Sequence, residues 1–272
     1  MNDQPLVAAI QLVSTDIVTE NLAAAETLIQ SAVDQGAVLV VLPENFAFMG
    51  TRERAVLAVA EADGAGPIQD FLAAIAAHLG ITLVAGSVAL LGPDPDRVQP
   101  ACLVYGPNGE RIARYDKRHL FDVSLADGEG YRESSTYAPG EAVVTAQTPA
   151  GRLGLSICYD LRFPEHYRDL VDQGAQILLA PSAFTAKTGA AHWSVLVHAR
   201  AIENLCYMVA PGQGGRHASG RQTHGESLVV GPWGETLASC PIAGGPGVAL
   251  ARLDLQSLPA LRARFPVLGH RR

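Results

Sequence analysis

The chain has 272 residues, of which 48% are hydrophobic and 17% charged, and its formal net charge is −7. This composition supplies a large buried core and excludes a disordered chain. The acidic charge argues against nucleic acid as a partner, since phosphate backbones need a basic surface, and no apolar run is long enough to span a membrane.

Cysteine usage indicates a reducing compartment. Four cysteines are widely spaced and form no C-x-x-C pair, and they are Cys102, Cys158, Cys206 and Cys240. Free thiols, together with an N-terminus that lacks a secretory pattern, predict a cytoplasmic protein. Metal ligands are not clustered at a suitable spacing, so we expect no metal and no cofactor.

The first elements read as strand, helix and strand. Leu6–Leu12 is an apolar run rich in Val, Ile and Ala, and helical spacing follows until Gly36, which is placed to end the helix. Val38–Leu42 has the continuous apolar pattern of a strand that is buried on both faces. This order implies a parallel pair with a right-handed crossover.

The chain then continues with alternating elements up to a long polar segment. A helix is predicted at Pro67–His78, and strands at Thr82–Val88, Ala101–Tyr105 and Arg111–Tyr115. From Leu120 to Pro139 the composition becomes polar and rich in glycine, which predicts a long loop. Such a loop inside a compact domain usually serves function.

The second half repeats the plan of the first. A strand is predicted at Leu153–Ile157, and later elements are a helix at Pro164–Gln173, a strand at Ile177–Ala180, a helix at Ala190–Asn204 and strands at Cys206–Ala210, Ser227–Val230, Thr236–Cys240 and Val248–Leu253. The pentapeptide Val33–Ala37 recurs as Val171–Ala175, which is either chance or the trace of a duplicated β-α-β unit. Duplication predicts a pseudo-twofold sandwich, and because no linker divides the chain we expect one domain over residues 1–272.

Three residues that could carry chemistry each follow a predicted strand. Cys158 lies at the carboxyl end of a strand, where α/β sheets bind ligands, although a small core residue is an alternative. Glu44 follows Val38–Leu42 directly, where burial of a carboxylate is costly, and it could accept the thiol proton unless it is a helix cap or a surface acid. Lys117 could stabilise a substrate oxyanion, or it could simply be solvated.

These residues lie in segments that resemble a known family. Leu42–Asn45, Tyr115–Asp122 and Cys158–Glu165 resemble, in order, the three signatures of the nitrilase superfamily, the carbon–nitrogen hydrolases with a Glu-Lys-Cys triad. Further segments are similar to the branch that contains deaminated-glutathione amidase and omega-amidase, and they are Pro181–Phe184, Thr188–Trp193, Ala199–Asn204, Gly215–His217 and Phe265–Arg272. One departure from this branch is Glu226, where a histidine is expected.

The resemblance implies a fold, an assembly and a fourth functional acid. The family fold is a four-layer αββα sandwich, commonly paired into dimers, so we expect a homodimer or a larger homo-oligomer. Glu133, on the long loop, matches the position of an acid that holds Lys117. By this resemblance Glu44 activates Cys158, and Lys117 and the backbone N–H of Tyr159 hold the oxyanion.

Substrate recognition is assigned to residues near these positions. Arg162 could clamp a carboxylate through two hydrogen bonds, with structural ion pairing as the alternative. Phe184 and Thr185 are expected to line the pocket, and Arg216 could contact a longer acid.

Three classes of function follow from this reading. The first is an amidase that hydrolyses the terminal carboxamide of a small carboxylated amide, deaminated glutathione above all, to acid and ammonia through a thioester. The second is an omega-amidase acting on 2-oxoglutaramate, or a hydrolase of N-carbamoyl amino acids. The third is a binding or scaffold protein on a retired enzyme fold, against which the intact set of Glu44, Lys117, Cys158 and Glu133 argues.

Overall fold

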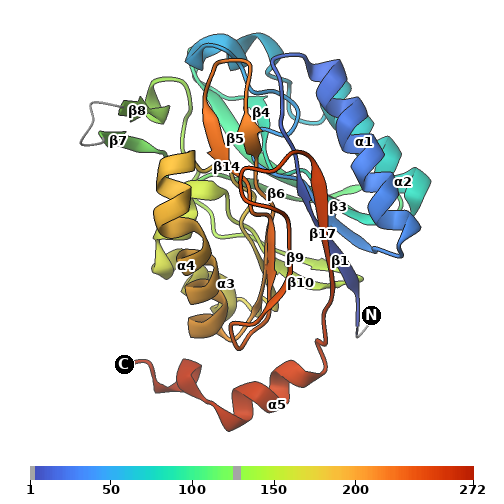
Figure 1. Cartoon of the computed structure of the whole chain (residues 1–272), viewed down its shortest axis with the longest axis vertical. Helices are drawn as coiled ribbons and strands as arrows, with labels where there is room; N and C mark the ends of the chain where they lie inside the picture. Colours follow the sequence, from blue (N-terminus) through green and yellow to red (C-terminus); the bar gives the residue numbers. More distant parts are fainter. Residues whose placement is uncertain (1–3, 125–129) are drawn as a thin grey trace.

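The computed structural model describes residues 4–124 and 130–272, in which two β-sheets face each other between layers of helices (Figure 1). The first sheet has the strand order β17-β1-β2-β3-β5-β4, and β6 also pairs with β5. The second sheet has the order β16-β15-β12-β11-β10-β9. The predicted αββα sandwich is therefore confirmed.

The strands fall into these two sheets and two small hairpins. Within the described residues, the first sheet consists of β1 (Leu6–Gln11), β2 (Leu39–Val41), β3 (Thr82–Val84), β4 (Val88–Leu91), β5 (Val98–Tyr105), β6 (Arg111–Asp116) and β17 (Gly247–Arg252). The second sheet consists of β9 (Thr145–Thr148), β10 (Gly151–Gly154), β11 (Ile177–Leu179), β12 (Tyr207–Ala210), β15 (Leu228–Val230) and β16 (Thr236–Ser239). The hairpins are β7 (Asp122–Ser124) with β8 (Gly130–Arg132), and β13 (Gly214–Arg216) with β14 (Gln222–His224).

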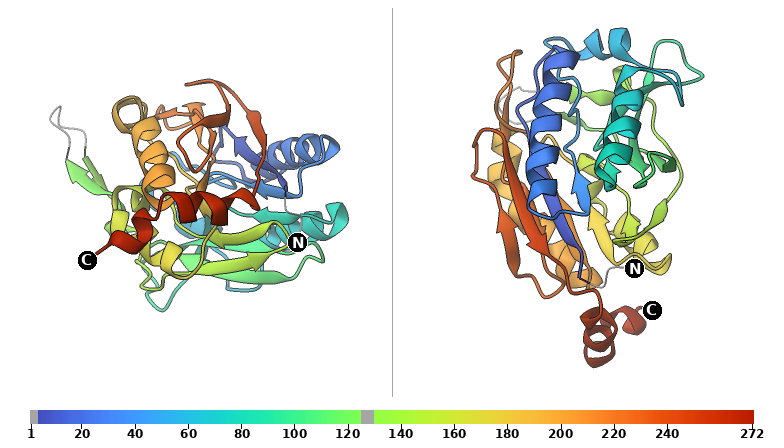
Figure 2. Two further views of the ribbon diagram at one scale, coloured as in Figure 1. Left: turned by 90° about the horizontal axis from the view of Figure 1, so that it is seen from below. Right: turned by 90° about the vertical axis from the view of Figure 1, so that its right-hand side faces the viewer.

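The helices form the outer layers, as the views in Figures 1 and 2 show. One outer layer is formed by α1 (Val18–Asp34) and α2 (Pro67–Leu79), and the other by α3 (Pro164–Asp172) and α4 (Ala186–Asn204). The C-terminal α5 (Ser257–Arg264) extends beyond the layers. The short 3₁₀ helices are η1 (Glu53–Val59), η2 (Glu133–Ser135), η3 (Cys158–Arg162) and η4 (Val267–His270).

Strand periodicity explains why the layers stack. Successive side chains of a strand point to opposite faces. In β1, Val7 and Ala9 enter the core between the two sheets, whereas Ala8 and Ile10 enter the core under α1 and α2. In β12 the same alternation divides its side chains between the central core and the core under α3 and α4. Strands buried on both faces therefore read as continuous apolar runs.

The repeated pentapeptide forms the same turn in both halves. Gly36 and Gly174 both adopt positive φ, at 97° and 87°. In each copy the glycine N–H donates to the carbonyl of the valine three positions earlier, at 2.8 Å. Each turn joins a helix to a parallel strand, α1 to β2 and α3 to β11. The predicted repeat of the two halves is confirmed.

Several predicted boundaries were wrong for identifiable reasons. The predicted strand at Thr82–Val88 is split into β3 and β4 at Gly86, where φ is 52° and a Cβ would lie 2.0 Å from a backbone oxygen of Pro43. The predicted strand at Leu153–Ile157 ends at Gly154, and beyond it the Ile157 N–H bonds the Asp160 side chain and no neighbouring strand.

Other differences concern elements that lack a clear sequence pattern. Helix α4 begins at Ala186 rather than Ala190, because the Thr185 hydroxyl accepts the Thr188 N–H and caps it. The predicted loop from Leu120 to Pro139 contains β7, β8 and η2, and its residues 125–129 lie outside the described residues. Strands β9, β13 and β14 and helix α5 were not predicted.

Candidate active site

One buried ammonium group lies between two carboxylates. Lys117 follows β6, and its Nζ lies 2.8 Å from Glu44 Oε1 and 2.7 Å from Glu133 Oε1. A second contact joins the same Nζ to Glu133 Oε2 at 2.9 Å. The Lys117 side chain is only 1% exposed, so these ion pairs are shielded from solvent. Three of the residues singled out from the sequence therefore converge, although they come from separate elements.

The backbone after β2 turns sharply and directs Glu44 toward Lys117. Asn45 adopts a positive φ of 58°, and its N–H bonds Ser87 Oγ at 2.8 Å. The second half of the chain completes the environment of Glu44. The Ala183 N–H donates to Glu44 Oε2 at 2.9 Å, and Gln213 Nε2 donates to the Glu44 carbonyl at 3.0 Å. The acid is thus held by hydrogen bonds on both its side chain and its backbone.

Cys158 begins η3 in a left-handed conformation, with φ of 47°. Its N–H bonds the Pro181 carbonyl at 2.9 Å. Burial raises the pKa of the Cys158 thiol well above its ordinary value, and the charge of Glu44 raises it further, while Lys117 and the Ala183 N–H oppose the shift. Cys158 and Glu44 both line the same cavity, and the Glu44 charge is close enough to act on the thiol. At neutral pH the sulfur therefore holds its proton and has a carboxylate beside it that can accept it.

Burial and the neighbouring charges together explain the pKa shifts of Lys117 and Glu133. Burial alone would lower the pKa of Lys117, but the charges of Glu133 and Glu44 outweigh burial and raise the pKa well above the usual lysine value. Lys117 is therefore cationic at every working pH. Burial raises the pKa of Glu133, and the charge of Lys117 opposes that shift. Glu133 Oε2 also accepts the Phe121 N–H at 2.5 Å, which fixes the acid relative to its loop.

A cavity of about 370 Å³ opens onto these four side chains. Tyr159, Arg162, Phe184 and Thr185 also line it, as the sequence analysis expected for the last three. The Arg162 guanidinium lies 5.2 Å from the centre of the Phe184 ring, and its Nη1 is 3.3 Å from His192 Nδ1. Among the described residues Arg162 forms no ion pair with an acid, and it is one of the cationic side chains that line the cavity.

Arg216 is placed elsewhere, and two other arginines line the cavity. Arg216 is exposed at the end of β13 and is not among the lining residues of the described chain. The lining instead includes Arg52 and Arg221, which sequence reasoning missed. Arg221 donates to the Ala183 carbonyl at 2.9 Å, and its guanidinium lies 5.4 Å from the centre of the Tyr131 ring. Neither arginine belongs to a recognisable motif, so no local signal could have identified it.

In residues 4–124 and 130–272, no group of three or more His, Cys, Asp or Glu side chains is arranged to hold a metal ion. Nor does any helix in this part of the chain have the length and apolar character that crossing a membrane requires.

Known proteins resemble this chain over nearly its whole length. The family model for carbon–nitrogen hydrolases matches residues 6–263. A deaminated glutathione amidase from Synechocystis is 45% identical over 270 residues, which are 98% of this chain and 97% of that protein. The C. elegans NitFhit protein superposes with a TM-score of 0.91 at 37% identity, covering 99% of this chain but only 65% of that longer one.

A third relative carries a modified cysteine. A glutamate-to-glutamine mutant of the amidase from Nesterenkonia sp. AN1 was solved with acrylamide joined to its active-site cysteine by Michael addition. It superposes with a TM-score of 0.78 at 28% identity, covering 96% of this chain and 99% of that one. With the family model spanning almost all of its residues and a relative of 45% identity, this chain belongs to the carbon–nitrogen hydrolase family.

Proposed function

We propose that this chain hydrolyses a carbon–nitrogen bond with Cys158 as nucleophile, Glu44 as general base and acid, and Lys117 as the cation that stabilises the oxyanion. The observation that carries the proposal is one buried ammonium shared by Glu44 and Glu133, at 2.8 and 2.7 Å, on the same cavity as the Cys158 thiol. With the thiol protonated, the four groups carry a net charge of −1. Transfer of the thiol proton to Glu44 leaves this total unchanged, and Lys117 then pairs with Glu133 while its charge also favours the thiolate.

The first half of the reaction forms a thioester. The Cys158 sulfur attacks the amide carbon as its proton passes to Glu44, and the carbonyl electron pair moves to the oxygen. Lys117 and the Tyr159 N–H hold this oxyanion; Tyr159 is in the first turn of η3, where N–H groups have no intrahelical acceptor. Glu44 then protonates the amine nitrogen, the C–N bond breaks and the amine leaves.

The second half returns the enzyme to its starting state. A water molecule attacks the thioester carbon while Glu44 takes one of its protons. The C–S bond breaks, the acid product leaves, and the proton on Glu44 returns to the sulfur. One water is consumed for each amide, and Glu133 keeps Lys117 in position through both halves.

We propose deaminated glutathione as the substrate. The Synechocystis relative carries the name of that activity, at 45% identity. Lining arginines support an anionic substrate, because a guanidinium can bind a carboxylate through two hydrogen bonds. Arg162 is the proposed clamp beside the nucleophile, with Phe184 and Thr185 as further substrate contacts. Arg216 has no place in this proposal, since it does not line the cavity of the described chain.

The expected leaving group needs a correction on chemical grounds. Glutathione has no terminal carboxamide, because its two amide bonds are peptide-like. Hydrolysis of the bond between its oxidised glutamyl part and cysteine gives 2-oxoglutarate and cysteinylglycine rather than ammonia. Ammonia is the amine product for primary amides such as 2-oxoglutaramate.

A panel of three substrates tests the proposal. Release of cysteinylglycine from deaminated glutathione is compared with release of ammonia from 2-oxoglutaramate and from an N-carbamoyl amino acid. We expect the highest kcat/KM for deaminated glutathione, and no turnover by Cys158→Ala. A higher value for 2-oxoglutaramate or the carbamoyl compound would replace the proposed substrate. If none were hydrolysed and acrylamide did not label Cys158, a binding protein would be the better description.

We also propose a single domain that assembles as a homodimer. The central core takes side chains from both halves of the chain, for example Val7 and Val209, which supports one folding unit. Helix α4 exposes two apolar side chains, Val195 at 69% and Ile202 at 46%, and Trp233, in the turn between β15 and β16, is 61% exposed. Apolar surface of this kind favours contact with a second copy.

The compartment is proposed from the thiols. All four cysteines are free, and three of them are buried. Free thiols are typical of reducing compartments, so we propose that the protein works in the cytoplasm.

A further inference from the structure

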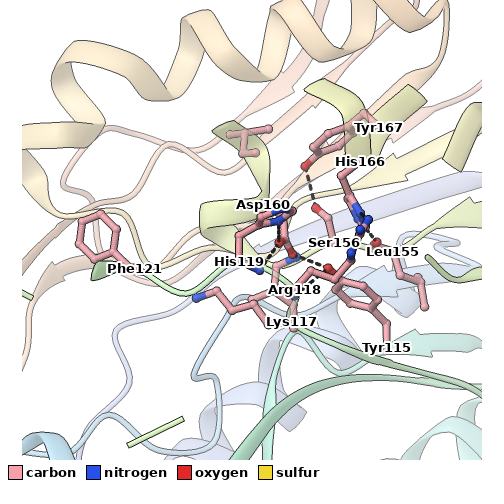
Figure 3. Close-up of polar contacts among 12 residues, drawn as sticks. Tyr115, Lys117, Arg118, His119, Phe121, Leu155, Ser156, Asp160, His166 and Tyr167 are labelled. Carbon is pink, nitrogen blue, oxygen red and sulfur yellow. Dashed lines mark hydrogen bonds and ion pairs between the residues drawn. The ribbon is translucent and has the colours of Figure 1, made fainter. Parts of the chain in front are cut away.

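A single buried carboxylate connects the two strand ends that carry Lys117 and Cys158. Asp160 lies two residues after Cys158 and is 0% exposed. Its Oδ2 accepts the Tyr115 hydroxyl at 2.7 Å and the Ile157 N–H at 2.8 Å. Its Oδ1 accepts the His119 N–H at 3.0 Å and the His119 ring Nδ1–H at 2.7 Å. Figure 3 shows Tyr115 and His119 directed toward Asp160 beside Lys117.

These bonds link two separate parts of the active site. Tyr115 and His119 lie two residues before and two residues after Lys117, whereas Ile157 immediately precedes Cys158. The Tyr115 hydroxyl also accepts the Arg118 N–H at 3.2 Å, which draws a further neighbour of Lys117 into the network. Asp160 thus joins the end of the first sheet to the end of the second.

The backbone bonds of Lys117 and Cys158 to their neighbouring strands do not join these two residues to each other. The Lys117 N–H bonds Pro100 and its carbonyl accepts the Gly140 N–H, so its backbone is held by its own half of the chain. The Cys158 N–H bonds Pro181 in the second half. Asp160 adds a direct connection between the segments around Lys117 and Cys158, in addition to the one that Glu44 makes through Lys117 and the Ala183 N–H.

A helix cap would explain only part of this arrangement. The bond from the Ile157 N–H is a normal cap of the short helix η3. The other bonds reach 41 and 45 residues along the chain and contribute nothing to that helix. Burial raises the pKa of Asp160, but the bonds from His119 and Tyr115 and the nearby His166 outweigh burial and leave the pKa below its ordinary value. The carboxylate is therefore ionised and can only accept, so the bonded His119 nitrogen carries the proton.

We propose that Asp160 is a positioning residue that sets the distance and orientation between Lys117 and the Cys158 sulfur. It touches neither group's reacting atom and acts through Tyr115, His119 and Ile157. The inference rests on the proposed function, in which the oxyanion must meet Lys117 while sulfur attacks. A displacement of about 1 Å in such a site can cost about 10²-fold in rate.

Two buried tyrosines provide a matched test. Tyr115 and Tyr167 are both 0% exposed, and each hydroxyl makes a short buried bond. Tyr115 bonds Asp160, whereas Tyr167 bonds Ser156 Oγ at 2.6 Å on the side away from Lys117 (Figure 3). Tyr115→Phe and Tyr167→Phe therefore remove the same atom from similar surroundings. Only the first removes a link in the Asp160 network.

Asp160→Asn is the direct test, with kcat, KM, Tm and the labelling rate of Cys158 by acrylamide as measurements. We expect kcat to fall by about 10- to 100-fold, with KM little changed and a proportional fall in labelling. Tyr115→Phe should show a smaller loss of the same kind. Tyr167→Phe should lose a similar amount of Tm but keep kcat and the labelling rate.

The outcomes separate positioning from stability. A folded Asp160→Asn with unchanged kcat and labelling would overturn the proposal. So would equal losses of kcat in the two tyrosine variants at equal Tm. If Asp160→Asn does not fold, the tyrosine pair decides alone. Labelling needs no substrate, so a wild type that fails to hydrolyse deaminated glutathione refutes the substrate and leaves this test intact.

Discussion

The charge on Glu133 provides the sharpest test of the shared ammonium. Glu133→Gln keeps the size of the side chain and removes one of the two negative charges that contact Lys117 Nζ. The oxygens of Glu133 lie 2.7 and 2.9 Å from that nitrogen, and Glu44 remains at 2.8 Å. The substitution therefore weakens the pairing of a buried charge without leaving it unpaired.

The magnitude follows from the lost contact. A hydrogen bond to a charged group contributes about 1.5–3 kcal/mol, so the free energy of unfolding should fall by about 2 kcal/mol. For a chain of this size each kcal/mol corresponds to about 2–4 °C, which gives a fall in Tm of roughly 4–8 °C. Removal of one group that organises the oxyanion contact should lower kcat by about 10²–10³-fold.

The control is the same substitution, Glu61→Gln, at a buried glutamate outside the site. Glu61 is 7% exposed, accepts the Ile68 N–H at 2.6 Å and the Gln69 N–H at 3.1 Å, and lies outside the lining of the cavity in the described chain. Glu61→Gln should lower Tm while kcat for deaminated glutathione stays near the wild-type value. Loss of one oxyanion donor lowers kcat by about 10²–10³-fold. A folded Glu133→Gln that keeps kcat within about fivefold of wild type, far less than that loss, would therefore refute the role assigned to Glu133.

Three further predictions concern recognition, pH and assembly. Arg221→Met should raise KM for deaminated glutathione by about tenfold, the effect of losing about 1.4 kcal/mol, while Arg216→Met should not change it; equal effects would show that the lining arginine has no special role. Burial raises the pKa of Cys158 above the ordinary thiol value of about 8.5, so the folded state retains a proton that the unfolded state releases, and stability is lost as pH rises. The Tm of the wild type should therefore fall more steeply between pH 8 and 10 than that of Cys158→Ser, and parallel curves would contradict this. Val195→Glu should convert a dimer to a monomer in light scattering, whereas Glu203→Gln should not; a wild type that is monomeric at the same concentration would exclude the proposed dimer.

Much of the fold was determined by local sequence. Apolar runs such as Val38–Leu42 predicted strands buried on both faces, since burial on two sides removes the alternation that a half-exposed strand shows. Helix α2 was predicted within one residue, because Pro67 begins it and Gly80 ends it with φ of 64°. The recurring pentapeptide predicted the repeat of the two halves, as the same turn requires the same residues.

The contacts around the site were decided only by the tertiary structure. The family resemblance paired Glu133 with Lys117, but nothing in the sequence indicated that Glu44 contacts the same ammonium, or that Asp160 joins the two sheets. Sequence reasoning selected Arg216, whereas Arg221 is the arginine that reaches the cavity. Local patterns report which face of an element is buried. Which side chains meet depends on how the two sheets pack against each other, and that is set by contacts between residues far apart in the chain.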